Sequence, residues 1–170
     1  MNQVKFKISQ KAAFLDRDGV INEDVGYLHK ISDFKWKKGA IEALKILKKN
    51  NFLIIIISNQ SGVSRGYFSE QDVYKLHKWI NLQLSKHKIK IDDFFFATEL
   101  PDSEILKNRR KPSPRMIEEA IEKYNLNRDD CFMIGDKDID VLAAKNAKIR
   151  GFLFEGGNLS YKIKKILNIT

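Results

Sequence analysis

Residues 14–22 read FLDRDGVIN, and this stretch decides how the rest of the chain is interpreted. A short apolar run, residues 12–15, ends abruptly in Asp16 and Asp18, and Gly19 follows them. Two carboxylates at the tip of a buried strand repel each other, so something must be gained from their placement. Paired aspartates also occur in turns and at helix N-caps. Whether the two aspartates have a structural or a functional role therefore depends on the residues at the ends of the other strands.

The chain has the size and composition of a folded domain. It has 170 residues, of which 43% are hydrophobic, and we expect a single domain over residues 1–170. No apolar run approaches the roughly 18 residues that cross a membrane, and the N-terminal residues lack the apolar region of a signal peptide. The one cysteine, Cys131, allows no internal disulfide, and its apolar neighbours predict a buried residue. We expect a cytoplasmic protein without a membrane partner.

The formal net charge of +9 favours an anionic partner. Lysine is nevertheless spread along the whole chain, without a compact basic block or interleaved basic and aromatic residues. This distribution is typical of a general compositional bias, so we do not expect nucleic acid as the partner, and we expect a monomer.

Apolar runs alternate with amphipathic stretches along the chain. We expect strands at residues 11–15, 52–58, 93–97, 131–135 and 151–154, and helices at residues 39–50, after Ser69, after Pro114, and at residues 138–147 and 160–168. Ser69 with Asp72 fits a capping box, and Ser113-Pro114 fits an N-cap followed by proline at the first helical position. This order predicts an α/β fold, a Rossmann-like doubly wound parallel sheet with helices on both faces.

Polar residues follow several of these strands. Residues 58–62, SNQSG, end the second strand; Asp136 ends the fourth, with Asp140 close behind; residues 109–111, RRK, precede the third helix. Ligands of parallel sheets bind at the carboxyl ends of the strands, so these groups should converge on one crevice. Gathered carboxylates suit Mg²⁺, whereas a hydroxyl, amides and a lysine suit a phosphoryl group. The pattern predicts metal-assisted phosphoryl transfer.

In order along the chain, these residues resemble the four motifs of the haloacid-dehalogenase-like (HAD-like) phosphatases. DRDGV, residues 16–20, resembles the first motif, DxDG[TV]; Ser58, Lys111 and residues 135–140 fit the other three. Longer segments resemble the D-glycero-D-manno-heptose 1,7-bisphosphate 7-phosphatases, and the histidinol-phosphate phosphatases share much of them: LDRDGVIN, DVGYLH, SNQSGVSRGYF, RKPSPRM and IGDKDIDVLAAKNA. The likeness spans residues 11–155.

The resemblance implies a role for each motif residue. Asp16 would be the nucleophile that forms an aspartyl phosphate, and Asp18 the general acid and base. Asp16, the backbone carbonyl of Asp18, and Asp136 would ligate Mg²⁺. Ser58 and Lys111 would bind the phosphoryl oxygens.

Further residues would hold the substrate or support the site. The resemblance assigns substrate binding to Ser58 and Lys111 together with Asp24, Val25, Gly26, Tyr27, Asn59, Gln60, Ser61, Arg110 and Lys137. Arg110 would clamp a distal anion, with a solvated loop arginine as the alternative, and Tyr27 suits packing equally well. Asp140 would orient the metal cluster rather than ligate the ion, and Arg17 would support only its own loop.

None of the three histidines fits as a base for Ser58, and the chain has no Gly-x-Ser-x-Gly motif. His77 lies beside apolar helix residues and is expected to pack, and His87 is expected to be exposed. The role of His29 stays open.

The resemblance breaks before the Lys-Pro motif. The heptose and histidinol phosphatases usually carry a zinc site there, built from Cys-x-His and Cys-x-Cys, but residues 97–109 contain neither cysteine nor histidine. We therefore expect Mg²⁺ and no zinc. Residues 19–38 and 98–110 are the only substantial insertions, which leaves no room for a large cap domain.

The leading hypothesis is a Mg²⁺-dependent phosphatase that acts on a phosphorylated sugar. Its most specific form is removal of the 7-phosphate of heptose 1,7-bisphosphate, in the synthesis of surface-polysaccharide precursors. Three alternatives remain: a histidinol-phosphate phosphatase, a polynucleotide 3′-phosphatase, and a non-catalytic binding module of the same fold. The intact set of Asp16, Asp18, Lys111 and Asp136 speaks against the last.

Overall fold

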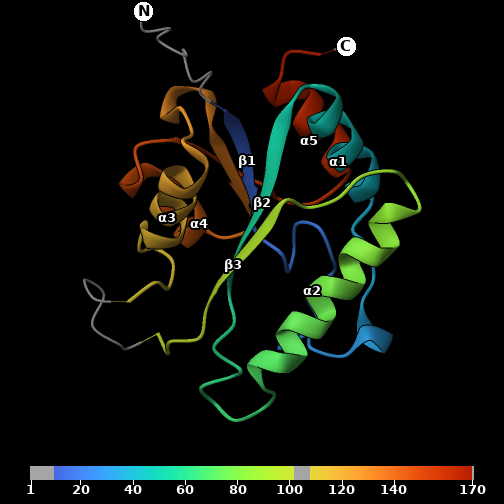
Figure 1. Cartoon of the computed structure of the whole chain (residues 1–170), viewed down its shortest axis with the longest axis vertical. Helices are drawn as coiled ribbons and strands as arrows, with labels where there is room; N and C mark the ends of the chain where they lie inside the picture. The colour runs from blue at the N-terminus through green and yellow to red at the C-terminus, as the bar shows by residue number, and fades with distance from the viewer. Residues whose placement is uncertain (1–9, 102–107, 170) are drawn as a thin grey trace, which may run out of the picture.

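The computed structural model describes residues 10–101 and 108–169, and a parallel β-sheet lies at its centre (Figure 1). The strand order is β3-β2-β1-β4-β5, and every neighbouring pair is parallel. The strands are β1 (Lys11–Leu15), β2 (Phe52–Asn59), β3 (Asp93–Ala97), β4 (Phe132–Gly135) and β5 (Arg150–Leu153). The predicted doubly wound α/β fold is confirmed.

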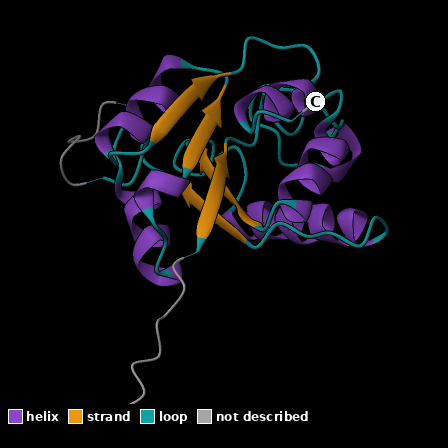
Figure 2. Ribbon diagram, turned by 90° about the horizontal axis from the view of Figure 1, so that it is seen from above, coloured by secondary structure: helices purple, strands orange, loops and turns teal. Residues whose placement is uncertain are grey.

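Helices cover both faces of the sheet (Figures 1 and 2). One face carries α1 (Ala40–Lys49), α2 (Glu70–Ser85) and α5 (Leu159–Ile166), and the other carries α3 (Arg115–Tyr124) and α4 (Asp138–Asn146). Short 3₁₀ turns span Ile31–Asp33 and Arg128–Asp130. No helix in the described part of the chain is long and apolar enough to cross a lipid bilayer.

The run of isoleucines in β2 explains why both faces are covered. Successive side chains of a strand point to opposite faces. Ile54 and Ile56 therefore pack into the core below α1, α2 and α5, whereas Ile55 and Ile57 pack into the core below α3 and α4. All four are fully buried, which fits a central parallel strand.

Local sequence signals mark the starts of α2 and α3, to within one residue. Ser69 Oγ accepts a hydrogen bond from Asp72 N (3.2 Å), and Asp72 Oδ2 accepts one from Ser69 N (3.0 Å), so the predicted capping box is confirmed. Helix α3 begins at Arg115, one residue later than Ser113-Pro114 predicted, and Pro114 takes the N-cap position. Ser113 Oγ still accepts a bond from Arg115 N (3.4 Å), because the chain turns into the helix around Pro114.

The structure also places the two histidines and the cysteine whose burial or exposure was predicted. His77 is buried and stacks on Phe94, and His87 is exposed, both as predicted. Cys131 is buried directly before β4, and its sulfur accepts a hydrogen bond from Ala12 N (3.3 Å). Burial raises the pKa of this thiol, which keeps it an unreactive core residue.

The topology brings the ends of three strands together. β1 lies between β2 and β4, so strand order reverses beside it, and the register pairs Leu15 with both Ile56 and Ile134. The loops that follow these strands therefore start at the same edge of the sheet, where ligands of such folds bind. Residues 16–39, which join β1 to α1, contain one short 3₁₀ turn and no cap domain.

Candidate active site

A pocket of about 260 Å³ opens at the carboxyl ends of β1, β2 and β4. It is lined by Asp16, Asp18, Asp24, Gly26, Tyr27, Asn59, Gln60, Ser61, Gly62, Arg110, Lys111, Lys137 and Ile139. The structure thus brings together most of the site residues that the sequence predicted. Three of the predicted site residues do not line this pocket. Ser58 is buried, and Val25 is 52% exposed. Asp136 lies with its carboxylate next to that of Asp16.

Lys111 and two aspartates form a buried charge cluster at the floor of the pocket. Lys111 Nζ lies 3.0 Å from Asp16 Oδ1 and 2.6 Å from Asp140 Oδ1, and it donates a hydrogen bond to Ile57 O (2.8 Å). The three N–H groups of the ammonium therefore have three oxygen partners. This arrangement compensates a buried cation with buried anions, as the low polarity of the interior requires.

The pKa values of this cluster reflect burial and mutual attraction. Burial raises the pKa of Asp16 to about 7, and the positive charge of Lys111 limits the rise. Burial alone would lower the pKa of Lys111, but the carboxylates of Asp16 and Asp140 outweigh it and raise that pKa. Lys111 stays charged, and the ionised form of Asp16 depends on nearby positive charge.

The carboxylates of Asp16, Asp136 and Asp140 form the candidate metal site. Each offers an oxygen, and these oxygens all lie within 4.8 Å of one another. Asp136 Oδ1 is buried without a hydrogen-bond partner among the described residues, which is costly unless a cation meets it. Burial raises the pKa of Asp136, so positive charge is needed here also.

Asp140 completes the carboxylate group but is already engaged. Its Oδ1 pairs with Lys111, and its Oδ2 accepts a hydrogen bond from Lys137 N (3.0 Å). These contacts fit the predicted orienting role. The Asp18 carboxylate is not part of this group, and the prediction that Asp18 ligates the ion through its backbone carbonyl stays a prediction.

Gly19 permits Asp136 to approach the first loop. Its φ is +86°, a region that favours glycine, and a Cβ atom there would lie 2.2 Å from Asp136 Oδ2. The glycine of the opening FLDRDGVIN stretch therefore serves both the turn and the contact between the loops after β1 and β4.

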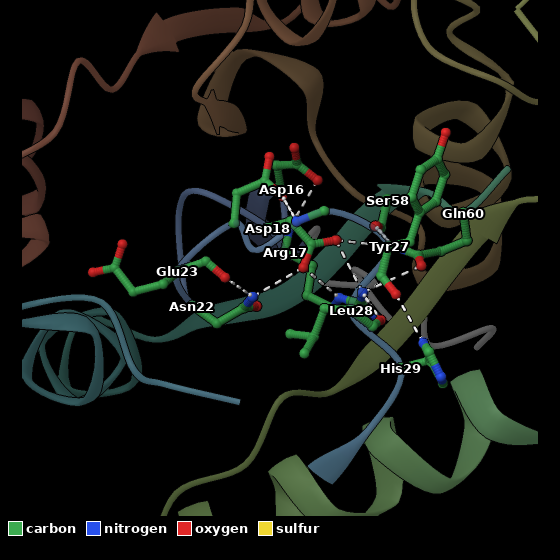
Figure 3. Close-up of polar contacts among 12 residues, drawn as sticks. Asp16, Arg17, Asp18, Asn22, Glu23, Tyr27, Leu28, His29, Ser58 and Gln60 are labelled. Atoms are coloured by element: carbon green, nitrogen blue, oxygen red, sulfur yellow. Dashed lines mark hydrogen bonds and ion pairs between the residues drawn. The ribbon is translucent and has the colours of Figure 1, made fainter. Parts of the chain in front are cut away.

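Four N–H groups hold the carboxylate of Asp18 (Figure 3). Asp18 Oδ1 accepts from Arg17 Nε (3.2 Å) and Asn22 Nδ2 (2.9 Å). Asp18 Oδ2 accepts from Arg17 Nη2 (2.9 Å) and Gln60 Nε2 (3.1 Å). The side chain of Asp18 is nevertheless 19% exposed, so it can exchange protons with the pocket.

The polar side chains at the end of β2 and directly after it form hydrogen bonds within the protein. Gln60 Nε2 also donates to Ser58 Oγ (2.7 Å), and Gln60 is buried. Asn59 clamps the backbone of Lys111, because its Oδ1 accepts from Lys111 N (2.9 Å) and its Nδ2 donates to Lys111 O (3.2 Å). The side-chain amides of Asn59 and Gln60 thus position Lys111 and Asp18, and both residues line the pocket together with Ser61.

Basic groups flank the pocket. Arg110 is half-buried and donates to Glu99 O (3.2 Å); burial and the nearby charge of Arg65 lower its pKa. Lys137 Nζ lies 3.2 Å from Asp24 Oδ2. Burial would lower the Lys137 pKa, but Asp136 and Asp24 raise it.

Aromatic contacts join the loops beside the pocket, and Tyr27 lines it. Tyr27 has a positive φ of 49° and meets the edge of Tyr67, with ring centroids 4.8 Å apart. His29 stacks on Phe68 at 4.9 Å, and its Nδ1 lies 2.9 Å from Tyr27 O. His29, whose role the sequence left open, therefore joins the loop after β1 to the loop after β2.

Three residues make contacts at the site that the sequence did not indicate. Arg17 was expected only to support its own loop, and neither Asn22 nor Tyr67 was assigned a role, although all three stand inside the quoted motifs. Asn22 bonds Asp18 within its own loop, whereas Arg17 and Tyr67 have partners from other parts of the chain, for which the local pattern offered no signal.

Known proteins are similar to this chain in sequence and in fold. The HAD-hydrolase-like family profile matches residues 108–164. A D-glycero-beta-D-manno-heptose-1,7-bisphosphate 7-phosphatase of Pasteurella multocida is 40% identical over 83% of this chain and 79% of its own. A D-glycero-alpha-D-manno-heptose-1,7-bisphosphate 7-phosphatase of Photorhabdus laumondii is 43% identical, covering 87% of this chain and 84% of its own.

A solved structure agrees with these sequence relatives. The D,D-heptose 1,7-bisphosphate phosphatase of B. bronchiseptica, complexed with magnesium and phosphate, superposes with a TM-score of 0.78 at 25% identity. The match covers 95% of this chain and 88% of that one. Together with the strand-end site, these similarities show that the chain belongs to the D-glycero-D-manno-heptose-1,7-bisphosphate 7-phosphatase family of HAD-like hydrolases.

Proposed function

We propose that this protein is a Mg²⁺-dependent phosphatase that removes the 7-phosphate of D-glycero-D-manno-heptose 1,7-bisphosphate. The observation that carries the proposal is the convergence of Asp16, Lys111 and Asp136 at one strand-end site. Identities of 40% and 43% to two heptose bisphosphate phosphatases support the choice of substrate.

Asp16 acts as the nucleophile. One of its carboxylate oxygens attacks the phosphorus of the ester, and the bond from phosphorus to the sugar oxygen breaks. An aspartyl phosphate forms on Asp16, and water then attacks its phosphorus to release inorganic phosphate and restore the carboxylate. Lys111 stabilises the negative charge on Asp16 and on the phosphoryl oxygens.

Asp18 moves the protons of both steps. In its protonated form it gives a proton to the departing sugar oxygen, and as a carboxylate it then takes a proton from the attacking water. After one cycle both carboxyl groups regain their starting state. The hydrogen bonds from Arg17, Asn22 and Gln60 orient the carboxylate for this exchange.

The residues present fit Mg²⁺. Carboxylate oxygens of Asp16 and Asp136, with the backbone carbonyl of Asp18, would hold the ion, and the unpartnered Asp136 Oδ1 supports this placement. Bound Mg²⁺ supplies positive charge that reduces repulsion between a carboxylate and a phosphate. We expect no zinc, because residues 97–109 hold no thiol or imidazole; residues 102–107 of that loop lie outside the described residues.

The remaining pocket residues suit a sugar with a second phosphate. Arg110 would clamp the distal 1-phosphate, while Lys137 and Asp24, which pair across the pocket, would contact the sugar hydroxyls. Ser61, Asn59 and Gln60 would contribute through the loop after β2. We further propose a cytoplasmic monomer.

A substrate panel tests the proposal. Phosphate release would be measured with Mg²⁺ on both anomers of heptose 1,7-bisphosphate, because relatives are named for each. Histidinol phosphate and a 3′-phosphorylated oligonucleotide would be measured beside them. We expect the highest kcat/KM on a heptose bisphosphate; preferred turnover of either other ester would contradict the proposal. Light scattering after size exclusion checks the monomer.

A further inference from the structure

We propose that Arg17 is a positioning residue that sets the orientation of the Asp18 carboxylate and couples it to residues 24–29, the substrate loop. This inference rests on the proposed phosphatase function, in which Asp18 transfers the protons. It departs from the sequence expectation that Arg17 supports only its own turn.

The first observation is the paired contact between the two neighbouring side chains (Figure 3). Arg17 Nε and Nη2 bind the two different oxygens of Asp18, at 3.2 and 2.9 Å. Such a fork fixes the plane of a carboxylate, which a single bond cannot do. Rotation of the Asp18 carboxylate away from the leaving group would break both bonds.

The second observation is that the same guanidinium reaches two other loops. Arg17 Nη2 donates to Leu28 O (2.8 Å), within the substrate loop, and to Gln60 Oε1 (3.2 Å), directly after β2. Leu28 is buried, and its neighbours Gly26 and Tyr27 line the pocket. A displacement of the substrate loop is therefore transmitted through Arg17 to Asp18.

The third observation is that stability alone gives a poor account of Arg17. The residue is 0% exposed, and its Nη1 is buried without a partner among the described residues. A buried cation with an unpartnered N–H is costly, and a buried ion pair is weak support for stability. The geometry points instead to control of carboxylate orientation.

The leaving group provides a specific test. A sugar alkoxide leaves only when Asp18 delivers a proton, whereas p-nitrophenolate leaves readily without one. Misorientation of Asp18 should therefore slow formation of the aspartyl phosphate from an alkyl ester and spare its formation from p-nitrophenyl phosphate. General loss of structure would slow both reactions alike.

The experiment compares the wild-type protein with Arg17→Lys and Arg17→Met, with Arg128→Lys as the matched control. The Arg17→Lys variant would keep the charge but lose the fork, and Arg128 bonds Ala147 O away from the pocket. Rapid-quench measurements give the rate of the first step with heptose bisphosphate and with p-nitrophenyl phosphate, and thermal unfolding checks the fold.

We expect both Arg17 variants to lose about 100-fold in the first-step rate on the sugar ester. On p-nitrophenyl phosphate we expect a change of about threefold or less, and no change for Arg128→Lys in either assay. Equal losses on both substrates, or no loss on the sugar ester, would overturn the inference; if Arg17→Met does not fold, Arg17→Lys decides. Wild-type inactivity on heptose bisphosphate would contradict only the proposed substrate, and the comparison then uses whichever alkyl phosphate the protein hydrolyses.

Discussion

Lys111 neutralises Asp16 from within the protein, with 3.0 Å between Nζ and Oδ1 and both side chains buried. The lysine arrives from the loop before α3, and Asn59 clamps its backbone from the end of β2. The charge opposite the nucleophile is therefore fixed by the sheet before any substrate binds. A phosphoryl group that enters must share this ammonium with two carboxylates.

Asp16→Asn should abolish turnover, since an amide does not attack phosphorus. We expect phosphate release to fall by at least about 10³-fold with the fold retained. Asp138→Asn is the matched control, because Asp138 is exposed in the first turn of α4 and should keep full activity. Retained turnover in Asp16→Asn would remove the nucleophile assignment.

Lys111→Met should destabilise the protein strongly as well as inactivate it. The substitution leaves the buried Asp16 and Asp140 without their cation, which costs about 3–5 kcal/mol in the free energy of unfolding. Adding Asp140→Asn should recover part of the loss, because one of the uncompensated charges is gone. Urea unfolding measures both. As a control, Lys123→Met breaks an exposed pair with Asp93 and should change the free energy of unfolding little. If the effects of Lys111→Met and Asp140→Asn on the free energy of unfolding simply add up, the two residues do not interact and the buried cluster is contradicted.

Gly19→Ala should weaken magnesium binding beyond its effect on the backbone. Any residue but glycine is strained at a φ of +86°, and the new Cβ would also displace Asp136. Gly157→Ala is a matched control, since its φ is +84° with nothing within 4 Å of the added atom. Both should lose stability, by about 1 kcal/mol from strain. Only Gly19→Ala should raise the Mg²⁺ concentration needed for half-maximal activity, by about tenfold or more. If Gly19→Ala and Gly157→Ala show the same dependence of activity on Mg²⁺ concentration, Asp136 is not a ligand.

His77 should make the folded protein less stable as the pH falls. Burial, and then the charge of Arg17, lower the His77 pKa from 6.5 to about 3. Between these values the unfolded chain binds a proton that the folded protein does not, so stability rises with pH across this window. The slope from this group is at most about 1.4 kcal/mol per pH unit.

His77→Phe tests this dependence, because a phenyl ring can keep the stacking on Phe94, 4.2 Å away. Urea unfolding from about pH 7.5 down to about pH 4.5 should show a shallower decline for His77→Phe than for the wild type. His87→Phe, exposed just beyond the end of α2, should follow the wild type. Parallel curves for His77→Phe and the wild type would show that His77 titrates normally.

Chelators should show that activity depends on Mg²⁺ and not on Zn²⁺. A chelator that takes Zn²⁺ and leaves Mg²⁺ should not affect activity, because residues 97–109 offer no soft ligands. EDTA should abolish activity, and added Mg²⁺ should restore it. Stoichiometric zinc in the purified protein, by elemental measurement, would contradict this prediction.

Periodicity and strand-end chemistry were enough to predict the sheet and the position of the pocket. β1 and β3 occupy the predicted residues, since an apolar run between polar loops, too short for a helix, has few other solutions. The start of α3 differed by one residue, because Ser113 and Pro114 can each precede the first helical turn.

The hydrogen bonds that join the loops of the site could not be predicted from the sequence. Arg17 and Asp18 find Gln60 from 43 and 42 residues away, and nothing local to an arginine in a turn specifies such a partner. The resemblance assigned Asn59 and Gln60 to the substrate, and both line the pocket. The sequence did not predict that their side-chain amides also hold Lys111 and Asp18, since these contacts depend on the packing of separate loops against one another.

The loops beside the pocket are held together differently from the floor of the pocket. Asp16, Lys111 and Asp140 are tied into the sheet by ion pairs, whereas Tyr27 meets Tyr67, and His29 meets Phe68, through their rings. Rings slide and exchange more readily than buried charges. The aromatic residues beside the pocket can therefore be exchanged with less disturbance of the sheet than the buried charges at its floor.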